Sequence, residues 1–319
     1  MSNMPSGQFN AHLQDELVMR VGIPQRSGKL AFHAFNEGYA GLVSANSFWN
    51  PQKQKFVVPE ASDLYEINVA LDSAGFVAMS QFHAKGKQAG IAGIYPWSLE
   101  AYVELAALLP RDWWAQVDFC CEAEIAKNQE EIDFRIDATA TMLEATLRVV
   151  YAWQNELAKT CSNETVAHML PPPVAVLQGR RTSDYLRSLD LLMQVWERWE
   201  PWLAPPKLIG IGSVCRRDLH DPEEGLYAIL QALDGKLPSG SKCHLFGVKG
   251  AALNEVKKLG WVASTDSLAW DMGARKKAHK GGFSNTIAHR TGEMTRWMSS
   301  AMSRITPSVG SQMPLGLFA

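Results

Sequence analysis

Acidic residues follow several apolar runs of this chain at the point where each run ends. The run EINVAL leads into Asp72, WWAQV into Asp118 and WVAST into Asp266. A single aspartate at such a place is better explained as a turn residue or helix N-cap, because its side chain bonds the backbone that follows. Two facing carboxylates can instead act on a glycosidic bond: one attacks the anomeric carbon and the other moves the proton of the departing group.

Small and polar residues also end the neighbouring apolar runs. PVAVL leads into Gln178 and Gly179, KLIGI into Gly212 and Ser213, and CHLFG into Val248 and Lys249. In a closed barrel of parallel strands, the carboxyl ends of the strands form the face where active sites are assembled. We therefore expect these residues to share one face with the aspartates.

The elements that would position these residues alternate along the chain. We predict strands from eight apolar runs: KLAFHAF (29–35), GLVSA (41–45), EINVAL (66–71), WWAQV (113–117), PVAVL (173–177), KLIGI (207–211), CHLFG (243–247) and WVAST (261–265). Amphipathic stretches predict helices over 98–109, with Ser98 as its N-cap, and over 135–158, 182–199, 222–233 and 251–259. The alternation, without a glycine fingerprint for a dinucleotide, predicts an α/β fold: a (β/α)8 TIM-like barrel in a single domain over residues 1–319.

Bulk composition bounds the classes of partner. The chain has 319 residues, 46% of them hydrophobic and 20% charged, and a formal net charge of −2, so no global field draws it to polyanions. Five cysteines without a framework of spacings predict a reducing compartment, and Cys120 beside Cys121 fits a pocket wall better than a zinc site. The sequence contains no apolar leader and no apolar stretch of membrane-spanning length, so we expect a cytoplasmic protein with no membrane partner.

Basic residues are unevenly distributed. The stretch from Asp271 to Arg304 has seven basic and two acidic side chains, a balance of +5 in a basic C-terminal segment (271–319). Such a run is usually a solvated face. Further basic pairs, 180–181 and 216–217, follow strand ends, however. A positive rim around a pocket lined by carboxylates would suit a phosphodiester substrate.

Six motifs together resemble a known enzyme superfamily. LDSAGF, VDFCCE, VAVLQG, IGIGSVCRR, HLFGVKG and STDSLAWDMGAR follow the order and spacing of the guanine transglycosylases, from about Leu71 to Arg275. The motifs GIGSVCRR, HLFGVK and TDSLAW are most similar to the phage and bacterial DNA branch, the DpdA-type 7-deazaguanine DNA transglycosylases. DSAGF is shared with the tRNA enzymes.

The resemblance implies a TIM barrel that exchanges a guanine in double-stranded DNA for a 7-deazaguanine base such as preQ0, without a cofactor. Asp266 resembles the family's nucleophile and Asp72 its acid/base. The residues it assigns to the purine pocket are Ser73, Asp118, Cys120, Gln178, Gly179, Gly212, Ser213 and Val214. The basic residues expected to contact nucleic acid are Arg180, Arg181, Arg216, Arg217, Lys249, Arg275, Lys276, Lys277 and Lys280.

The chain departs from the family pattern at two places. Ser213 stands where the tRNA enzymes have a second glycine, and the stretch after Asp266 lacks the cysteines that bind zinc in relatives. We therefore predict no metal and no zinc subdomain: either packing by Phe283 and Trp297 replaces the metal, or the tail is organised differently. Two alternatives remain open: base exchange in tRNA, and a catalytically silent barrel that binds nucleic acid. A homo-oligomer is compatible with the sequence.

Overall fold

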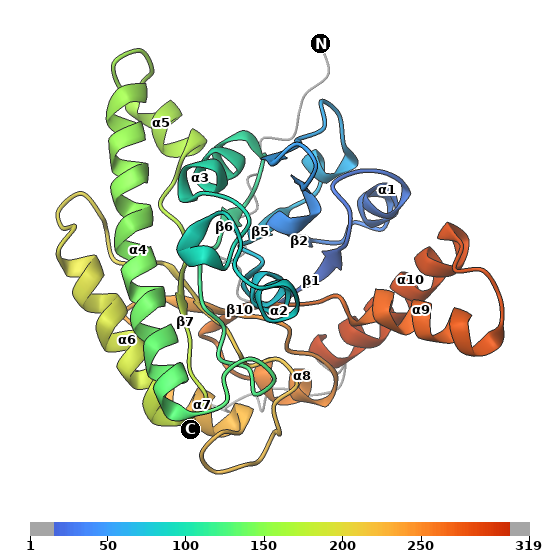
Figure 1. The fold of residues 1–319 in the computed structure, drawn as a ribbon. Helices are drawn as coiled ribbons and strands as arrows, with labels where there is room; N and C mark the ends of the chain where they lie inside the picture. The colour runs from blue at the N-terminus through green and yellow to red at the C-terminus, as the bar shows by residue number, and fades with distance from the viewer. Residues whose placement is uncertain (1–15, 307–319) are drawn as a thin grey trace, which may run out of the picture.

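The computed structural model describes residues 16–306, which form an α/β fold around a curled sheet of eight parallel strands (Figure 1). The strands of this sheet are β1 (Val18–Ile23), β2 (Gly41–Ser44), β5 (Val69–Asp72), β6 (Trp113–Trp114), β7 (Ala175–Leu177), β8 (Leu208–Ile211), β9 (Lys242–Leu245) and β10 (Val262–Ser267). Their order is β6-β5-β2-β1-β10-β9-β8-β7. A short antiparallel hairpin of β3 (Trp49–Asn50) and β4 (Lys55–Phe56) lies apart from the sheet.

The curl brings the two edge strands together. The amide of Val174 donates to the carbonyl of Trp114 at 2.8 Å, and the amide of Gln116 donates to the carbonyl of Val174 at 2.9 Å. These bonds join the chain after β6 to the chain before β7. The α/β class is confirmed, and the arrangement is consistent with the expected TIM-like barrel.

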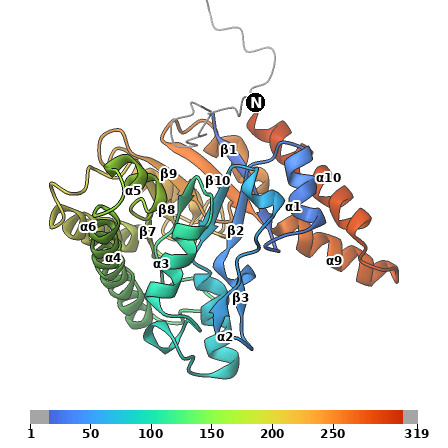
Figure 2. The same cartoon turned by 90° about the horizontal axis from the view of Figure 1, so that it is seen from above.

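Helices follow most strands and cover the outside of the sheet. They are α1 (Lys29–Asn36), α2 (Gly75–Lys85), α3 (Leu99–Leu108), α4 (Gln129–Leu157), α5 (Asn163–Met169), α6 (Thr182–Glu197), α7 (Leu226–Leu233), α8 (Leu253–Val256), α9 (Ala269–Gly281) and α10 (Ile287–Ile305). Four 3-10 turns add η2 (Ala45–Ser47), η3 (Asp63–Tyr65), η4 (Ile91–Gly93) and η5 (Gly250–Ala252). Helices α4 and α6 pack together on one flank, and α9 and α10 pack together on the opposite flank (Figure 2).

Seven of the eight predicted strand runs contain a strand, and each predicted helical range contains a helix. Ser98 caps α3 as expected, since its Oγ accepts from the amide of Ala101 at 3.2 Å. The prediction for KLAFHAF was wrong, because these residues form α1. Leu30, Ala31 and Ala34 are buried along one side of this helix, and the first barrel strand is the earlier run VMRVGI.

Helices α9 and α10 are clamped by ion pairs. The guanidinium of Arg290 donates to Asp271 Oδ1 at 2.8 and 2.5 Å, and Asp271 also pairs with Arg275 one turn along α9. Lys277 donates to Glu293 at 2.6 Å. The basic segment expected from residue 271 is thus built into this helical pair up to residue 306, and its remainder lies outside the described residues.

Within residues 16–306, the helices are all too short or too polar to cross a lipid bilayer.

Candidate active site

The carboxyl ends of the parallel strands gather the acidic residues that the sequence singled out. Asp72 is the last residue of β5, Asp266 lies near the end of β10, and Asp118 follows β6. Asp118 and Asp266 are buried, and Asp72 is partly buried. The negative charges of both act on the carboxyl of Asp72. The structure therefore brings the three side chains to one end of the sheet.

Hydrogen bonds from three elements hold Asp118. Ser73 Oγ donates to its Oδ1 at 2.5 Å, and Gln178 Nε2 donates to its Oδ2. The hydroxyl of Tyr95 donates to its backbone carbonyl at 2.5 Å. Because these donors come from the ends of β5 and β7 and from the loop before α3, the carboxylate is fixed in orientation before any ligand binds.

Glycines let these side chains approach the backbone. A Cβ on Gly212 would overlap the amide of Gln178, and a Cβ on Gly75 would lie 2.8 Å from Asp118 Oδ1. A Cβ on Gly179 would likewise lie 2.8 Å from Asp184. Glycine at these positions follows from close contact, since none of them has a positive φ.

Ser213 extends the network to a further acid. Its Oγ accepts from the amide of Cys121 at 2.6 Å and lies 2.6 Å from Gln178 Oε1 and 3.0 Å from Glu122 Oε2. A hydroxyl has one proton, so Ser213 donates to one of these two acceptors at a time. Ser213 holds a φ of 54°, a left-handed conformation that glycine would adopt at less cost.

Apolar side chains complete the walls of this network. Cys120, two residues after Asp118, and Val214, the residue after Ser213, are both buried. Burial raises the pKa of the Cys120 thiol well above its usual value, so it behaves as a small hydrophobic group.

Asp266 is held separately from Asp118. Its Oδ1 accepts from the amide of Gly247 at 2.8 Å and lies 3.3 Å from Nε2 of His244. His244 is fully buried, and burial lowers its pKa, so the ring is neutral. Asp266 is thus an ionisable group bonded by uncharged donors.

Asp72 has the structural role that its place in the sequence allowed, that of a turn residue. Its Oδ2 accepts from the amide of Ala74 at 3.0 Å, and Ala74 has a φ of 71°, so the side chain does close the turn before α2. Burial, and then the charge of Asp118, raise its pKa to about 7. At neutral pH, this carboxyl can both give and take a proton.

The pKa of Asp118 is raised less. Burial raises it to about 6, the charge of Glu122 acts in the same direction, and the hydrogen bonds from Ser73 and Gln178 oppose them. The donors on Asp118 thus favour its charged form, whereas the charge of Asp118 further disfavours ionisation of Asp72. Environments that differ in this way let one carboxyl accept hydrogen bonds while the other transfers protons.

The basic residues expected at the rim fall into two groups. Arg217 donates to the carbonyls of Ser213 at 2.7 Å, Arg180 at 2.8 Å and Gly179 at 2.9 Å, and Arg180 donates to Ala126 O at 3.0 Å, so both tie pocket loops together. Lys249 is partly buried beside Cys215. The exposed members of the set are Arg181, Arg216, Arg275, Lys276, Lys277 and Lys280.

Arg216 lies over an aromatic ring from α2. Its guanidinium carbon is 5.5 Å from the centre of the Phe76 ring, in the first turn of α2. Phe76 is 36% exposed. Trp270, in contrast, is a core residue whose Nε1 donates to Gly22 O at 3.0 Å. Phe76 thus reaches the surface, whereas Trp270 does not.

Three polar residues of this site were not predicted: His244, Tyr95 and Glu122. His244 is the polar residue within the run CHLFG, and its two-residue spacing from the apolar Phe246 was the available sign that both face inward. Tyr95 and Glu122 lie in loops without periodicity, so no pattern in the sequence places them.

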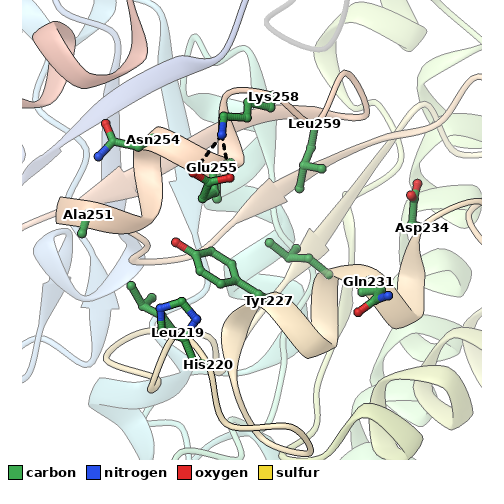
Figure 3. A pocket seen from close by; sticks show the side chains of 12 residues that line it. Leu219, His220, Tyr227, Gln231, Asp234, Ala251, Asn254, Glu255, Lys258 and Leu259 are labelled. Atoms are coloured by element: carbon green, nitrogen blue, oxygen red, sulfur yellow. Dashed lines mark hydrogen bonds and ion pairs between the residues drawn. The ribbon is translucent and has the colours of Figure 1, made fainter.

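A hollow of about 700 Å³ lies elsewhere, on the outside of the sheet between α7 and α8 (Figure 3). Tyr227 and His220 line one side of it, and Glu255 and Lys258 pair on the other. None of the three aspartates contributes to its lining. We place the candidate site at the strand ends because the coupled carboxyl groups are there.

The residues after Asp266 do not fit a cysteine-bound zinc. Residues 267–306 contain no cysteine, and within residues 16–306 no group of three or more His, Cys, Asp or Glu side chains could hold a metal ion. The ring of Phe283 meets His289 at 5.0 Å, and Trp297 packs against the core. We derive no chemical step through a metal.

The geometry can be compared with known proteins. A search of the curated proteins finds no match. A family model named DpdA, described as DeoxyPurine in DNA protein A, matches residues 47–308 and so spans β5 to β10 with all three aspartates. On this match, the chain belongs to the DpdA family.

Proposed function

We propose that this protein replaces guanine in DNA by a 7-deazaguanine base of the preQ0 type, through a covalent bond between Asp266 and the sugar. Membership of the DpdA family supports a DNA-guanine transglycosylase in 7-deazaguanine modification of DNA. The observation that carries the chemistry is the meeting of Asp72, Asp118 and Asp266 at one end of a single parallel sheet. We also propose that the chain acts as one barrel domain without a zinc subdomain.

Base recognition falls to Asp118 and Gln178. A target guanine must leave the helical stack before any side chain can reach C1′. The ionised Asp118 then accepts hydrogen bonds from N1 and N2 of the purine, and Gln178 contacts O6 or N7. Burial of both residues strengthens these bonds relative to water.

The first displacement forms a glycosyl ester. Asp266 attacks C1′, the bond from C1′ to N9 of guanine breaks, and the protonated Asp72 gives its proton to the departing base. A carboxyl whose pKa is about 7 is still largely protonated at slightly lower pH and can donate. This is the double-displacement logic of retaining glycosidases.

The second displacement reverses these steps with a different base. The 7-deazaguanine occupies the same pocket, Asp72 takes its N9 proton, and N9 displaces Asp266 from C1′. The proton lost by Asp72 in the first half is regained in the second, and the configuration at C1′ is retained. No outside energy is needed because one glycosidic bond replaces another.

The exposed cations support a nucleic-acid partner. Arg181 and Arg216, in segments that follow β7 and β8, and Lys276 and Lys280, on α9, are exposed and can contact phosphates. Arg180 and Arg217 contribute indirectly, because their hydrogen bonds to backbone carbonyls hold the loops of the purine pocket in place.

The deciding experiment supplies labelled preQ0 with either duplex DNA or tRNA and follows label into each. We expect label in DNA and none in tRNA. Asp266→Asn keeps the size of the side chain but is not nucleophilic, so exchange should fall by about 10³-fold or more. Label in tRNA alone would redirect the proposal to tRNA. No exchange, with no covalent DNA adduct, would favour a silent barrel that binds nucleic acid.

A further inference from the structure

The hydrogen bonds on Asp266 are unevenly divided between its two oxygens. Among the described residues, the bonds from Gly247 N at 2.8 Å and from His244 Nε2 at 3.3 Å both end on Oδ1. An oxygen already engaged by two donors is the poorer nucleophile. The other oxygen, Oδ2, is therefore the one available for attack at C1′.

The environment of His244 fixes the direction of its own N–H. The ring centre lies 4.8 Å from that of Trp113 and 4.6 Å from that of Phe246, and the side chain is fully buried. Nδ1 lies 2.8 Å from Ser264 Oγ. A neutral ring carries one N–H, and the opposite tautomer would turn the Nε2 lone pair toward the Asp266 carboxylate. We assign the proton to Nε2, with the Ser264 hydroxyl donating to Nδ1.

Arg20 carries a positive charge on the neighbouring strand, but its hydrogen bonds go to residues other than Asp266. Arg20 is the register neighbour of Asp266 on β1, but its guanidinium donates to Asp112 at 2.5 Å and to Asn68 Oδ1 at 2.8 Å, both before strands β6 and β5. Its positive charge acts on Asp266 from a distance. Direct contact with the carboxylate comes from His244 and from the backbone of Gly247.

We propose that His244 is a positioning residue for the nucleophile, an inference that rests on the proposed function. Its Nε2–H holds Oδ1 so that Oδ2 faces C1′. When the ester forms, Oδ1 becomes its carbonyl oxygen and keeps the same donors. When N9 of the incoming base breaks the ester, the charge returning to the carboxylate develops beside two preorganised N–H groups, which lowers that barrier.

Matched variants of His244 separate this role from packing. His244→Phe keeps an aromatic ring but removes the donor, and His244→Gln restores an N–H on a smaller side chain. Adduct formation on guanine-containing DNA is measured in a single turnover, alongside the dissociation constant for free preQ0 and the melting temperature. We expect His244→Phe to slow adduct formation by about 10- to 100-fold with unchanged preQ0 affinity, and His244→Gln to recover most of the loss.

The outcomes are distinct. Wild-type adduct formation by His244→Phe would overturn the inference, and so would equal losses of preQ0 affinity and adduct rate, which a merely structural role produces. If His244→Phe does not fold, Ser264→Ala replaces it as the test, because this variant removes the hydroxyl that orients the His244 ring. It should slow adduct formation by about 3- to 10-fold. An unchanged rate of adduct formation in Ser264→Ala would also overturn the inference. If the wild-type protein formed no covalent adduct with DNA, the proposed function itself would be contradicted.

Discussion

At the scale of single residues, the site holds carboxyl groups where ionisation is costly. Burial raises the pKa of Asp72 to about 7 and that of Asp118 to about 6. The negative charge of Asp118 adds to the free-energy cost of ionising Asp72. An unfolded chain would ionise both near pH 4. The same feature that suits Asp72 to proton transfer therefore reduces the stability of the fold at neutral pH.

The Asp72→Asn variant tests this cost. A carboxyl with a raised pKa contributes stability below about pH 4, and that contribution is lost as the pH rises through about 7. Asparagine can still accept from the amide of Ala74 but carries no charge. We expect the variant to be more stable than the wild type by about 1–3 kcal/mol at pH 8 and equally stable near pH 4. Denaturant unfolding across this pH range measures the difference.

Asp190→Asn is the matched control because Asp190 is exposed on α6. Its unfolding free energy should follow the wild type at every pH. Equal stability of Asp72→Asn and the wild type at pH 8 would show that the folded protein does not disfavour ionisation of the Asp72 carboxyl.

At the scale of elements, the α9–α10 pair occupies the part of the chain where relatives were expected to bind zinc, and an ion pair fastens it. Asp271 and Arg290 have side chains only 3% and 10% exposed, and they meet through two hydrogen bonds. Removing one partner of a buried pair leaves the other charge without compensation.

Arg290→Met is therefore expected to lower the free energy of unfolding by about 3 kcal/mol, because Asp271 then keeps, within residues 16–306, a single ion pair with the exposed Arg275. Lys277→Met is the control, since that amine is 61% exposed in its pair with Glu293 and should cost at most about 1 kcal/mol. Urea unfolding compares the two. Equal losses would mean that the buried pair does not fasten the helices.

Helices and strands could be predicted from the sequence where one face of the element is apolar or where an apolar run ends on a polar residue. These two signals predicted seven strands correctly and predicted that the three aspartates lie at the same end of the sheet. It failed at KLAFHAF, where Leu30, Phe32 and Ala34 alternate as in a strand while Leu30, Ala31 and Ala34 also share a helix face. It also could not supply His244, because its contact with Asp266 depends on the register of β9 against β10.

At the scale of the whole molecule, a net charge of −2 means that the proposed binding to DNA must depend on local patches of positive charge. Several rim cations are already partnered: Arg181 with Glu223 and Glu224, and Arg216 with Glu124. Lys276 and Lys280 are exposed on α9, on the flank opposite α4 (Figure 2). The α9 flank is therefore where we expect sequence-independent phosphate contacts.

Titrating salt measures those contacts, because each phosphate neutralised by a lysine or arginine releases counterions. Replacing Lys276 and Lys280 together by alanine should weaken binding to duplex DNA of any sequence and reduce the slope of log affinity against log salt by about 1–2. Arg148→Ala removes an exposed cation from α4, where its side chain is 71% exposed, and should leave the slope unchanged. If both variants changed the slope equally, DNA would not be held on the α9 flank, and the cations there would serve only as a solvated face.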